Sequence, residues 1–182
     1  MRLVLEQTPA ESTAYRFAKL DLHFFSPASG HAVKGDVSSG EVYYTNSTHL
    51  NVKHSMNPIE RVTNEGLFHP LIEAGSISHV WMGESMPTKG AIADFVTKTF
   101  RYTLSDQIAF SPEFTVCNSC SQTSRGLEES CPHCQSEDVD GITRITGYFT
   151  KVSSWNKGKR GELKDRFRNG EFFVEEKQRD VV

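Results

Sequence analysis

The chain carries all four of its cysteines between residues 117 and 134, in two Cys-x-x-Cys pairs. The pairs are Cys117 with Cys120 and Cys131 with Cys134, and ten residues separate them. Two such pairs on tight turns close a tetrahedron of thiolates around Zn²⁺, with Zn–S distances of about 2.3 Å. Because protein ligands fill all four positions, the metal would hold the segment together and would not act as a Lewis acid. The spacing therefore predicts a structural zinc site.

The cysteine segment also admits other interpretations. Two disulfides fit the count, although the N-terminus lacks a secretory signal and we expect a cytoplasmic chain, whose thiols stay reduced. An iron–sulfur cluster takes the same spacing. His133 stands between Cys131 and Cys134 and could replace one thiolate as a donor. The surrounding residues are small and polar, so something other than apolar burial must hold this segment.

Length and charge exclude several classes of protein. At roughly 100–200 residues per domain, 182 residues allow one domain or slightly more, and a complete barrel enzyme of ~250 residues does not fit. The net charge of −3 gives no overall attraction to nucleic acid or anionic lipid. The apolar runs are far shorter than the ~18 residues that cross a bilayer. We expect no membrane and no nucleic-acid partner.

Capping signals and apolar spacing predict a mixed α/β fold with parallel connections. Thr8-Pro9-Ala10-Glu11 begins a predicted helix that ends near Pro27, with Ala14, Phe17 and Ala18 on its apolar face. Asn57-Pro58-Ile59-Glu60 repeats this signal and predicts a helix to about Gly66. Strands are predicted over 41–45, 77–82 and 142–149, a loop over 26–40, a short helix through 71–74, a helix after Pro87-Thr88 with Ile92, Phe95, Val96 and Phe100 inward, and a basic helix over 157–168.

A glycine interrupts the predicted strand 142–149. From the residue pattern alone, Gly147 indicates a bulge or a close backbone approach. Its context adds more, because Arg144-Ile145-Thr146-Gly147-Tyr148 follows the last cysteine and precedes Val152-Ser153-Ser154-Trp155-Asn156-Lys157-Gly158-Lys159. This arrangement resembles the glycyl-radical signature of the anaerobic (class III) ribonucleoside-triphosphate reductases.

The resemblance extends over nearly the whole chain. Segments similar to the C-terminal third of that family are Glu11-Ser12-Thr13-Ala14-Tyr15-Arg16-Phe17-Ala18, Tyr43-Tyr44-Thr45-Asn46-Ser47-Thr48, Glu65-Gly66-Leu67-Phe68-His69-Pro70, Phe110-Ser111-Pro112-Glu113-Phe114 and the basic stretch 157–166. It implies an α/β fold that is the C-terminal part of a glycyl-radical-enzyme barrel with a four-cysteine zinc-ribbon-like segment. Residues 1–114 would form the partial barrel, 115–140 the zinc-binding segment, and 141–182 the radical loop and C-terminal helix and tail.

The resemblance also implies a chemistry for Gly147. In the family, an activase that uses SAM and a 4Fe-4S cluster removes a hydrogen atom from the glycine Cα. The stored radical then oxidises a barrel cysteine to a thiyl, which attacks the ribose. Carried over, Gly147 is the radical site and the four cysteines are its zinc-held support. Glycine suits this role because a Cα without a side chain can become planar and delocalise an electron into the flanking amides.

The chain departs from the family in length. The family's catalytic subunits are several times longer and contain a regulatory nucleotide domain and the thiyl cysteine. If all four cysteines bind zinc, no thiol is left here, so we expect a radical-bearing portion that needs a companion chain with the rest of the barrel. The nucleotide substrate would bind the assembled enzyme. The alternatives are a standalone glycyl-radical repair domain and a non-catalytic zinc-ribbon interaction module.

Other polar residues allow weaker predictions. Those after the strand 41–45 could line a substrate cleft, since polar groups at strand ends do so in α/β folds; they are Tyr43, Tyr44, Asn46, Ser47 and Thr48. The scattered His49, His54, His69 and His79 are predicted to be surface or ordinary core residues. The basic segment 151–168 is predicted to be a solvated helix, with docking to an activase or to nucleotide phosphates as the alternative.

Overall fold

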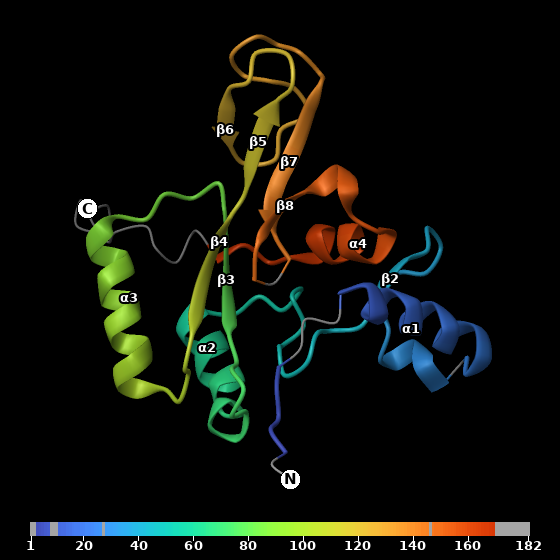
Figure 1. Cartoon of the computed structure of the whole chain (residues 1–182), viewed down its shortest axis with the longest axis vertical. Helices are drawn as coiled ribbons and strands as arrows, with labels where there is room; N and C mark the ends of the chain where they lie inside the picture. The colour runs from blue at the N-terminus through green and yellow to red at the C-terminus, as the bar shows by residue number, and fades with distance from the viewer. Residues whose placement is uncertain (1–2, 8–10, 27, 146, 170–182) are drawn as a thin grey trace, which may run out of the picture.

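Figure 1 shows a computed structural model of the chain, which describes residues 3–7, 11–26, 28–145 and 147–169. The helices are α1 Glu11–Phe24, η1 Ala28–His31, α2 Pro58–Gly66, η2 His69–Leu71, α3 Lys89–Tyr102, η3 Val152–Ser154 and α4 Lys157–Asp165, where η marks a 3-10 helix. The strands are β1 Lys34–Asp36, β2 Glu41–Tyr43, β3 Ser78–Gly83, β4 Ile108–Pro112, β5 Phe114–Cys117, β6 Thr123–Arg125, β7 Val139–Arg144 and β8 Phe149–Lys151. The predicted mixed α/β class is confirmed.

The strands β3 and β4 pair in parallel, and α3 connects them. Successive side chains of a strand point to opposite faces. On one face of β3, Val80 and Met82 pack with Val62 of α2 and Phe95 of α3 to form an apolar core. His79 and Trp81 belong to the opposite face and are also buried. Both faces of β3 are therefore covered, one by helices and the other by Tyr43, Val52 and Arg166.

The cysteine segment forms an antiparallel sheet with the strand order β6-β5-β7-β8 (Figure 1). In it β5 pairs with β7 from Phe114↔Ile142 to Cys117↔Val139, and β7 pairs with β8 at Arg144↔Phe149. The strand β7 runs across residues 140 and 141, where the predicted zinc-binding and radical segments meet. The two segments share one sheet.

The predicted strand 142–149 is wrong in its second half. β7 ends at Arg144 and the chain turns back into β8 at Phe149, so Gly147 lies in the hairpin connection and not inside a strand. The composition of this stretch suits a strand throughout, but the chain reverses direction within it, so that Arg144 pairs with Phe149. Gly147 therefore lies in the turn between β7 and β8.

The predicted loop 26–40 contains η1 and β1. β1 forms a short hairpin with β2, and Gly35 allows the close approach, since a Cβ there would lie 2.0 Å from the carbonyl oxygen of Glu41. The predicted short helix through 71–74 occurs earlier, as η2, because Pro70 occupies its first turn. The signals Thr8, Pro9 and Ala10 lie outside the described residues.

Two aromatic residues predicted to face inward do not. Phe17 on α1 and Phe100 on α3 are 47% and 50% exposed, while Ala18 and Phe95 occupy the buried faces of these helices. The basic helix is also less solvated than predicted, because Gly158 and Gly161 of α4 pack against the backbone of β2. Among the residues that the structure describes, we find no helix with the length and apolar content needed to cross a membrane.

Candidate functional site

The four cysteine thiols converge at one end of the antiparallel sheet. All four Sγ atoms lie within 4.8 Å of one another, and the thiols are free. Each pair closes a tight turn through a backbone hydrogen bond, from Ser121 N to Cys117 O at 3.0 Å and from Gln135 N to Cys131 O at 2.8 Å. This is the donor set of a tetrahedral metal site such as a zinc site. The exposed His133 is not part of the convergent set.

The two cysteine turns have the same local geometry. Ser121 and Gln135 each follow the second cysteine of a pair and adopt positive φ values of 58° and 62°. In the first turn the Cys120 N–H approaches Cys117 Sγ at 3.4 Å, and this hydrogen bond is the largest of several contacts, with the Ser119 backbone and the neighbouring thiols, that together lower the pKa of Cys117 to about 6. A metal binds the thiolate, so the turn favours the form of the side chain that coordinates.

The hairpin that carries Gly147 is exposed. A Cβ added at Gly147 would meet no atom within 4 Å among the described residues. The preceding Ile145 is buried in a cluster with Trp155 and Leu163. The Trp155 Nε1–H donates to Thr150 Oγ1 at 2.7 Å, which ties the chain after β8 to the return strand. The base of the hairpin is fixed, whereas Gly147 is exposed with respect to the described residues.

A buried arginine joins this hairpin to β3. The Arg166 guanidinium lies 3.8 Å from the centre of the Trp81 ring and 5.7 Å from that of Trp155, and its Nη2 donates to Glu162 Oε1 at 3.0 Å. Its side chain is fully buried. Burial lowers the pKa of Arg166, and the carboxylate of Glu162 opposes that shift. The strand that leads to Gly147 is thereby packed on the His79 and Trp81 face of β3.

A small cavity lies on this same face. Its lining includes Tyr43, Asn46, His49, Glu65, His79 and Ile145. A water molecule's centre can occupy about 20 Å³ there. Ile145 stands two residues before Gly147 in the sequence, so the cavity adjoins the base of the glycine hairpin. Sequence reasoning placed Tyr43 and Asn46 at a cleft but missed His49 and His79, because these two appear scattered along the chain and come together only in the fold, with ring centres 5.7 Å apart.

Of the residues predicted to line a substrate cleft, some line the cavity and others do not. Tyr43 and Asn46 line the cavity. The Tyr43 hydroxyl donates to Asp165 Oδ2 at 2.9 Å, and burial together with this contact raises its pKa. Tyr44 instead donates to Asp21 at 2.8 Å, and Thr48 Oγ1 accepts from Gln7 Nε2 at 2.7 Å. The hydroxyls of Tyr44 and Thr48 are thus engaged with Asp21 and Gln7, and Ser47 is exposed.

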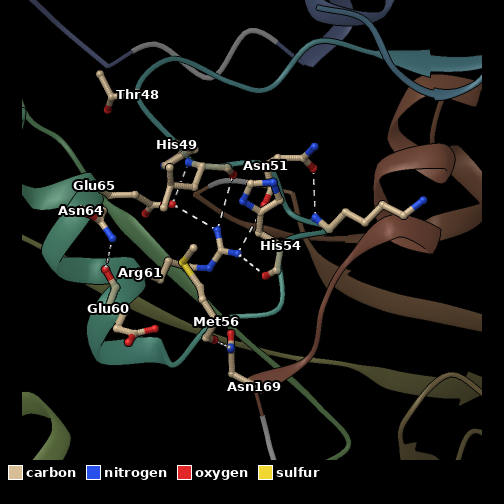
Figure 2. A network of polar contacts seen from close by, with 12 residues as sticks. Thr48, His49, Asn51, His54, Met56, Glu60, Arg61, Asn64, Glu65 and Asn169 are labelled. Atoms are coloured by element: carbon tan, nitrogen blue, oxygen red, sulfur yellow. Dashed lines mark hydrogen bonds and ion pairs between the residues drawn. The ribbon is translucent and has the colours of Figure 1, made fainter. Parts of the chain in front are cut away.

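An ion pair between Arg61 and Glu65 organises the loop at one side of the cavity (Figure 2). Both side chains are 2% exposed, and their closest charged atoms are 3.4 Å apart. Arg61 Nη2 donates to the carbonyl oxygens of Asn51 at 3.3 Å and His54 at 3.0 Å, while Glu65 Oε1 accepts from Leu50 N at 3.0 Å. Sequence analysis missed this pair; the one available signal was its spacing of four residues around the buried Val62.

His79 is held in a fixed orientation on the other side of the cavity. Its Nδ1 lies 3.1 Å from Ser111 Oγ, and its ring stacks on Trp81 with centres 5.0 Å apart. Burial lowers the pKa of His79 to about 3, so the imidazole is neutral at neutral pH. His79 was predicted to be a surface or ordinary core residue. That role does not explain its Nε2, which is buried and has no hydrogen-bond partner among the described residues.

Comparison with known proteins gives one consistent result. Residues 1–168 match the sequence profile of anaerobic ribonucleoside-triphosphate reductase. The chain is 28% identical over 176 residues to the protein of that name from Escherichia coli (strain K12), an alignment covering 91% of the chain and 23% of that protein. The corresponding protein of Enterobacteria phage T4 is 26% identical over 177 residues, with 91% and 27% covered. The chain thus spans about a quarter of the length of these relatives.

Solved structures agree in fold. An anaerobic ribonucleotide reductase superposes on 90% of this chain with a TM-score of 0.68 and 24% identity, using 24% of its own length. The anaerobic ribonucleotide reductase from Thermotoga maritima, solved in complex with dATP and CTP, gives a TM-score of 0.61 and 22% identity over 89% of this chain and 24% of its own. At these identities the superpositions establish the likeness in fold alone.

Proposed function

The chain belongs to the anaerobic ribonucleoside-triphosphate reductase family, and from that premise we propose that it is the radical-bearing C-terminal portion of such an oxidoreductase. The observation that carries this proposal is the family match over residues 1–168 in a chain that spans only 23% of its Escherichia coli relative. On this basis the parallel pair β3 and β4 is part of a larger barrel. We also infer a cytoplasmic location, in line with the free cysteines.

Gly147 is the radical site in this proposal. An activase that uses SAM and a 4Fe-4S cluster would take one hydrogen atom from its Cα and leave the unpaired electron on the backbone. Two observations support the assignment: Gly147 is exposed, so a second protein can reach it, and a Cβ built on it meets no described atom within 4 Å, so the described residues do not enclose its Cα. The packed Ile145 and Trp155 keep the base of the hairpin in place meanwhile.

The four cysteines hold a structural zinc ion in this proposal. Zn²⁺ bound by Cys117, Cys120, Cys131 and Cys134 supplies cross-links between the two turns and leaves no position for substrate. The thiolates would thereby fix the far end of β5 and β7, and β7 leads directly to the glycine hairpin.

A companion chain supplies the remaining parts. This chain has four cysteines, all in the cluster, so the thiol that becomes a thiyl radical and the rest of the ribonucleotide site must come from elsewhere. Large apolar side chains support such a partner, because they are exposed on α1 and after α2, where a lone chain gains nothing from them. These are Phe17, Leu20, Phe24, Leu67, Phe68 and Leu71.

Electron paramagnetic resonance tests the proposal. Anaerobic incubation of the chain with a cognate activase, SAM and a reductant should give a carbon-centred doublet that Gly147→Ala lacks. The variant is a clean control, because an alanine Cβ at this position meets no described atom. Admitting air should then cleave the wild-type chain at Gly147, which mass spectrometry detects.

The outcomes separate the proposal from its alternatives. A silent spectrum, under conditions that activate a full-length relative, would contradict the radical assignment and leave a zinc-ribbon interaction module. A radical that restores activity to an oxygen-cleaved full-length enzyme, with no companion chain present, would instead identify a standalone repair domain. Metal analysis should find about one zinc per chain, as expected for one four-thiolate site.

A further inference from the structure

An apolar groove lies between the first turn of α3 and the ends of β3, β4 and β6. Its lining includes Met82, Met86, Pro87, Ile92, Phe110 and Arg125. The groove has a volume of about 180 Å³. A cavity of roughly 150 Å³ accommodates a benzene ring, so there is room for one phenylalanine side chain. Methionine side chains adapt to aromatic rings and contact them favourably, so the groove suits an aromatic occupant.

The described part of the chain ends beside this groove. The Arg168 Nε donates to Glu113 Oε2 at 2.9 Å, and the aliphatic part of the Arg168 side chain lies where Gly83 has no side chain. Glu113 directly follows Pro112, which also lines the groove. An extended chain spans up to ~3.6 Å per residue, so the four residues after Arg168 can reach about 14 Å. The fourth of them is Phe172, which can therefore reach the groove.

The sequence after Asn169 has the composition that the groove calls for. Residues 170–182 lie outside the described part of the chain, and they contain the apolar run Phe172-Phe173-Val174 with glutamates on both sides, at 171, 175 and 176. Arg125 stands at the groove, where its Nη1 donates to Ser85 O at 3.3 Å, and no described carboxylate forms an ion pair with it. Apolar side chains flanked by acids thus match an apolar groove with a cation beside it.

A segment of the same chain is favoured over a partner as the occupant. A short tether holds the segment near the groove at an effective concentration on the order of millimolar. A separate chain must first associate and lose its translational freedom before it gains the same contacts. Thirteen residues follow Asn169, so the segment is long enough to enter the groove and continue past it.

We propose that the C-terminal segment Phe172-Phe173-Val174 docks in this groove, with one phenylalanine ring against Met82 and Met86 and a flanking glutamate near Arg125. The groove is built by α3 and β4 together with β6 of the cysteine sheet. The docked segment would therefore link that sheet to the helix and strand on which it stands. This contact is independent of the radical chemistry proposed for Gly147.

Nuclear magnetic resonance of the methionine methyl groups in the intact chain tests the docking. Met82 and Met86 place two such methyl groups at the groove. A packed aromatic ring shifts neighbouring resonances, so Phe172→Ser combined with Phe173→Ser should move both signals. The matched control is Phe24→Ser combined with Phe25→Ser, which changes another adjacent pair of phenylalanines, 67% and 64% exposed at the end of α1. This control should leave both methionine signals in place.

A synthetic peptide with the sequence of residues 170–177 tests the same contact in trans. Added to the variant that lacks Phe172 and Phe173, it should return both methionine signals to their wild-type positions. Arg125→Gln should weaken the peptide only about twofold, as expected for one exposed ion pair, because Glu84 and Glu128 already lie near the adjoining Gly126. Arg101→Gln, exposed in the last turn of α3, is the control and should bind the peptide normally.

Two outcomes would overturn the inference. Methionine signals that stay the same when Phe172 and Phe173 are replaced would show that the segment does not occupy the groove, which would then be left to a companion chain. Wild-type signals that move on dilution would show that a second copy supplies the occupant. The Trp81 indole resonance, from the face of β3 opposite Met82, should be unchanged in every variant and checks that the protein remains folded.

Discussion

The body around β3 and the sheet that carries the cysteines are stabilised by different means. In the body, the buried Val62, Val80, Met82 and Phe95 form a continuous core, and the ion pair of Arg61 and Glu65 is enclosed beside it. In the cysteine sheet, the thiols of Cys117 and Cys131 are buried, and most of the side chains between the two cysteine pairs are polar and exposed. The first region folds by burying apolar surface, whereas the second buries less of it, and we expect its stability to depend on its cysteines.

Gly147 lies where these two regions meet. β7 belongs to the cysteine sheet, yet Ile145 packs with Trp155 and Leu163, and Arg166 connects that cluster to Trp81 of β3. The position of the hairpin thus depends on both regions. Substitutions that weaken one region and spare the other should separate the two contributions.

The largest effect is expected from the cysteines. Cys131→Ser should lower the free energy of opening of β5 and β7 by several kcal/mol, on the order of 5, because metal binding and folding are coupled in such segments. Hydrogen exchange should show faster exchange over residues 114–144 and little change in β3. Ser130→Ala is the control. Full protection in metal-free protein would show that the sheet does not need its metal.

In the body, removing a core aromatic should have the next largest effect. Phe95→Ala leaves a void against Val62 and Val80 and should destabilise the protein by about 4 kcal/mol. Phe100→Ala, on the exposed side of the same helix, should cost less than about 1 kcal/mol. Urea unfolding measures both. Similar losses for the two variants would mean that α3 is not packed as described.

Breaking the buried ion pair should be slightly less costly. Arg61→Met leaves the carboxylate of Glu65 buried without its partner and removes the donor to Asn51 and His54, so we expect a loss of about 3 kcal/mol. The double variant Arg61→Met, Glu65→Leu should recover part of this loss, because no charge is then left buried. Equilibrium unfolding of the three proteins checks the comparison. An additive double variant would contradict the pairing.

His79 should make stability depend on pH. Its folded-state pKa of about 3 lies below the unfolded value near 6.5, so the unfolded chain binds an extra proton between these values. The free energy of unfolding should therefore fall by about 1.4 kcal/mol for each pH unit below 6.5, relative to a chain without this group. Unfolding of the wild type and His79→Gln from pH 7 to 4 measures the difference. Parallel curves would show that the imidazole is not buried.

The smallest effect concerns a helix cap. Asn57 Oδ1 accepts from Ile59 N at 2.8 Å at the start of α2, so Asn57→Ala should cost about 1 kcal/mol. Asn118 makes an exposed contact of the same length to Asp138 in the cysteine sheet, and Asn118→Ala should change stability by less than about 0.5 kcal/mol. Thermal unfolding compares the two. A reversed order would undermine the contrast between the regions.

Features written in local sequence were predictable. The cysteine spacing predicts the cluster, which the structure assembles, and Asn57-Pro58 predicts the start of α2 where it occurs. Both signals act within a few residues. The parallel pairing of β3 and β4 across α3 agrees with the predicted parallel connections, whereas the other described strand pairs are antiparallel.

Features that depend on distant contacts were not predictable. The pairing of Trp81 with Arg166, and the enclosure of Glu65 by the loop at Leu50, exist only after the chain has folded back on itself. The hairpin at Gly147 was missed for another reason: residues 142–149 suit a strand throughout, and their reversal is decided by the pairing of Arg144 with Phe149. The full lining of the cavity at His79 was hard to predict for both reasons, because it depends on distant contacts and on the position of the hairpin.

The pairing of β5 with β7 aligns Cys117 with Val139 and, further along, Phe114 with Ile142. A slip of one residue in such a ladder turns every side chain over to the opposite face. The thiols at one end therefore fix the register in which β7 pairs with β5. Ile145 points inward, and the turn after it outward, only in this register. The orientation of Gly147 is therefore set by the cysteines at the opposite end of β7.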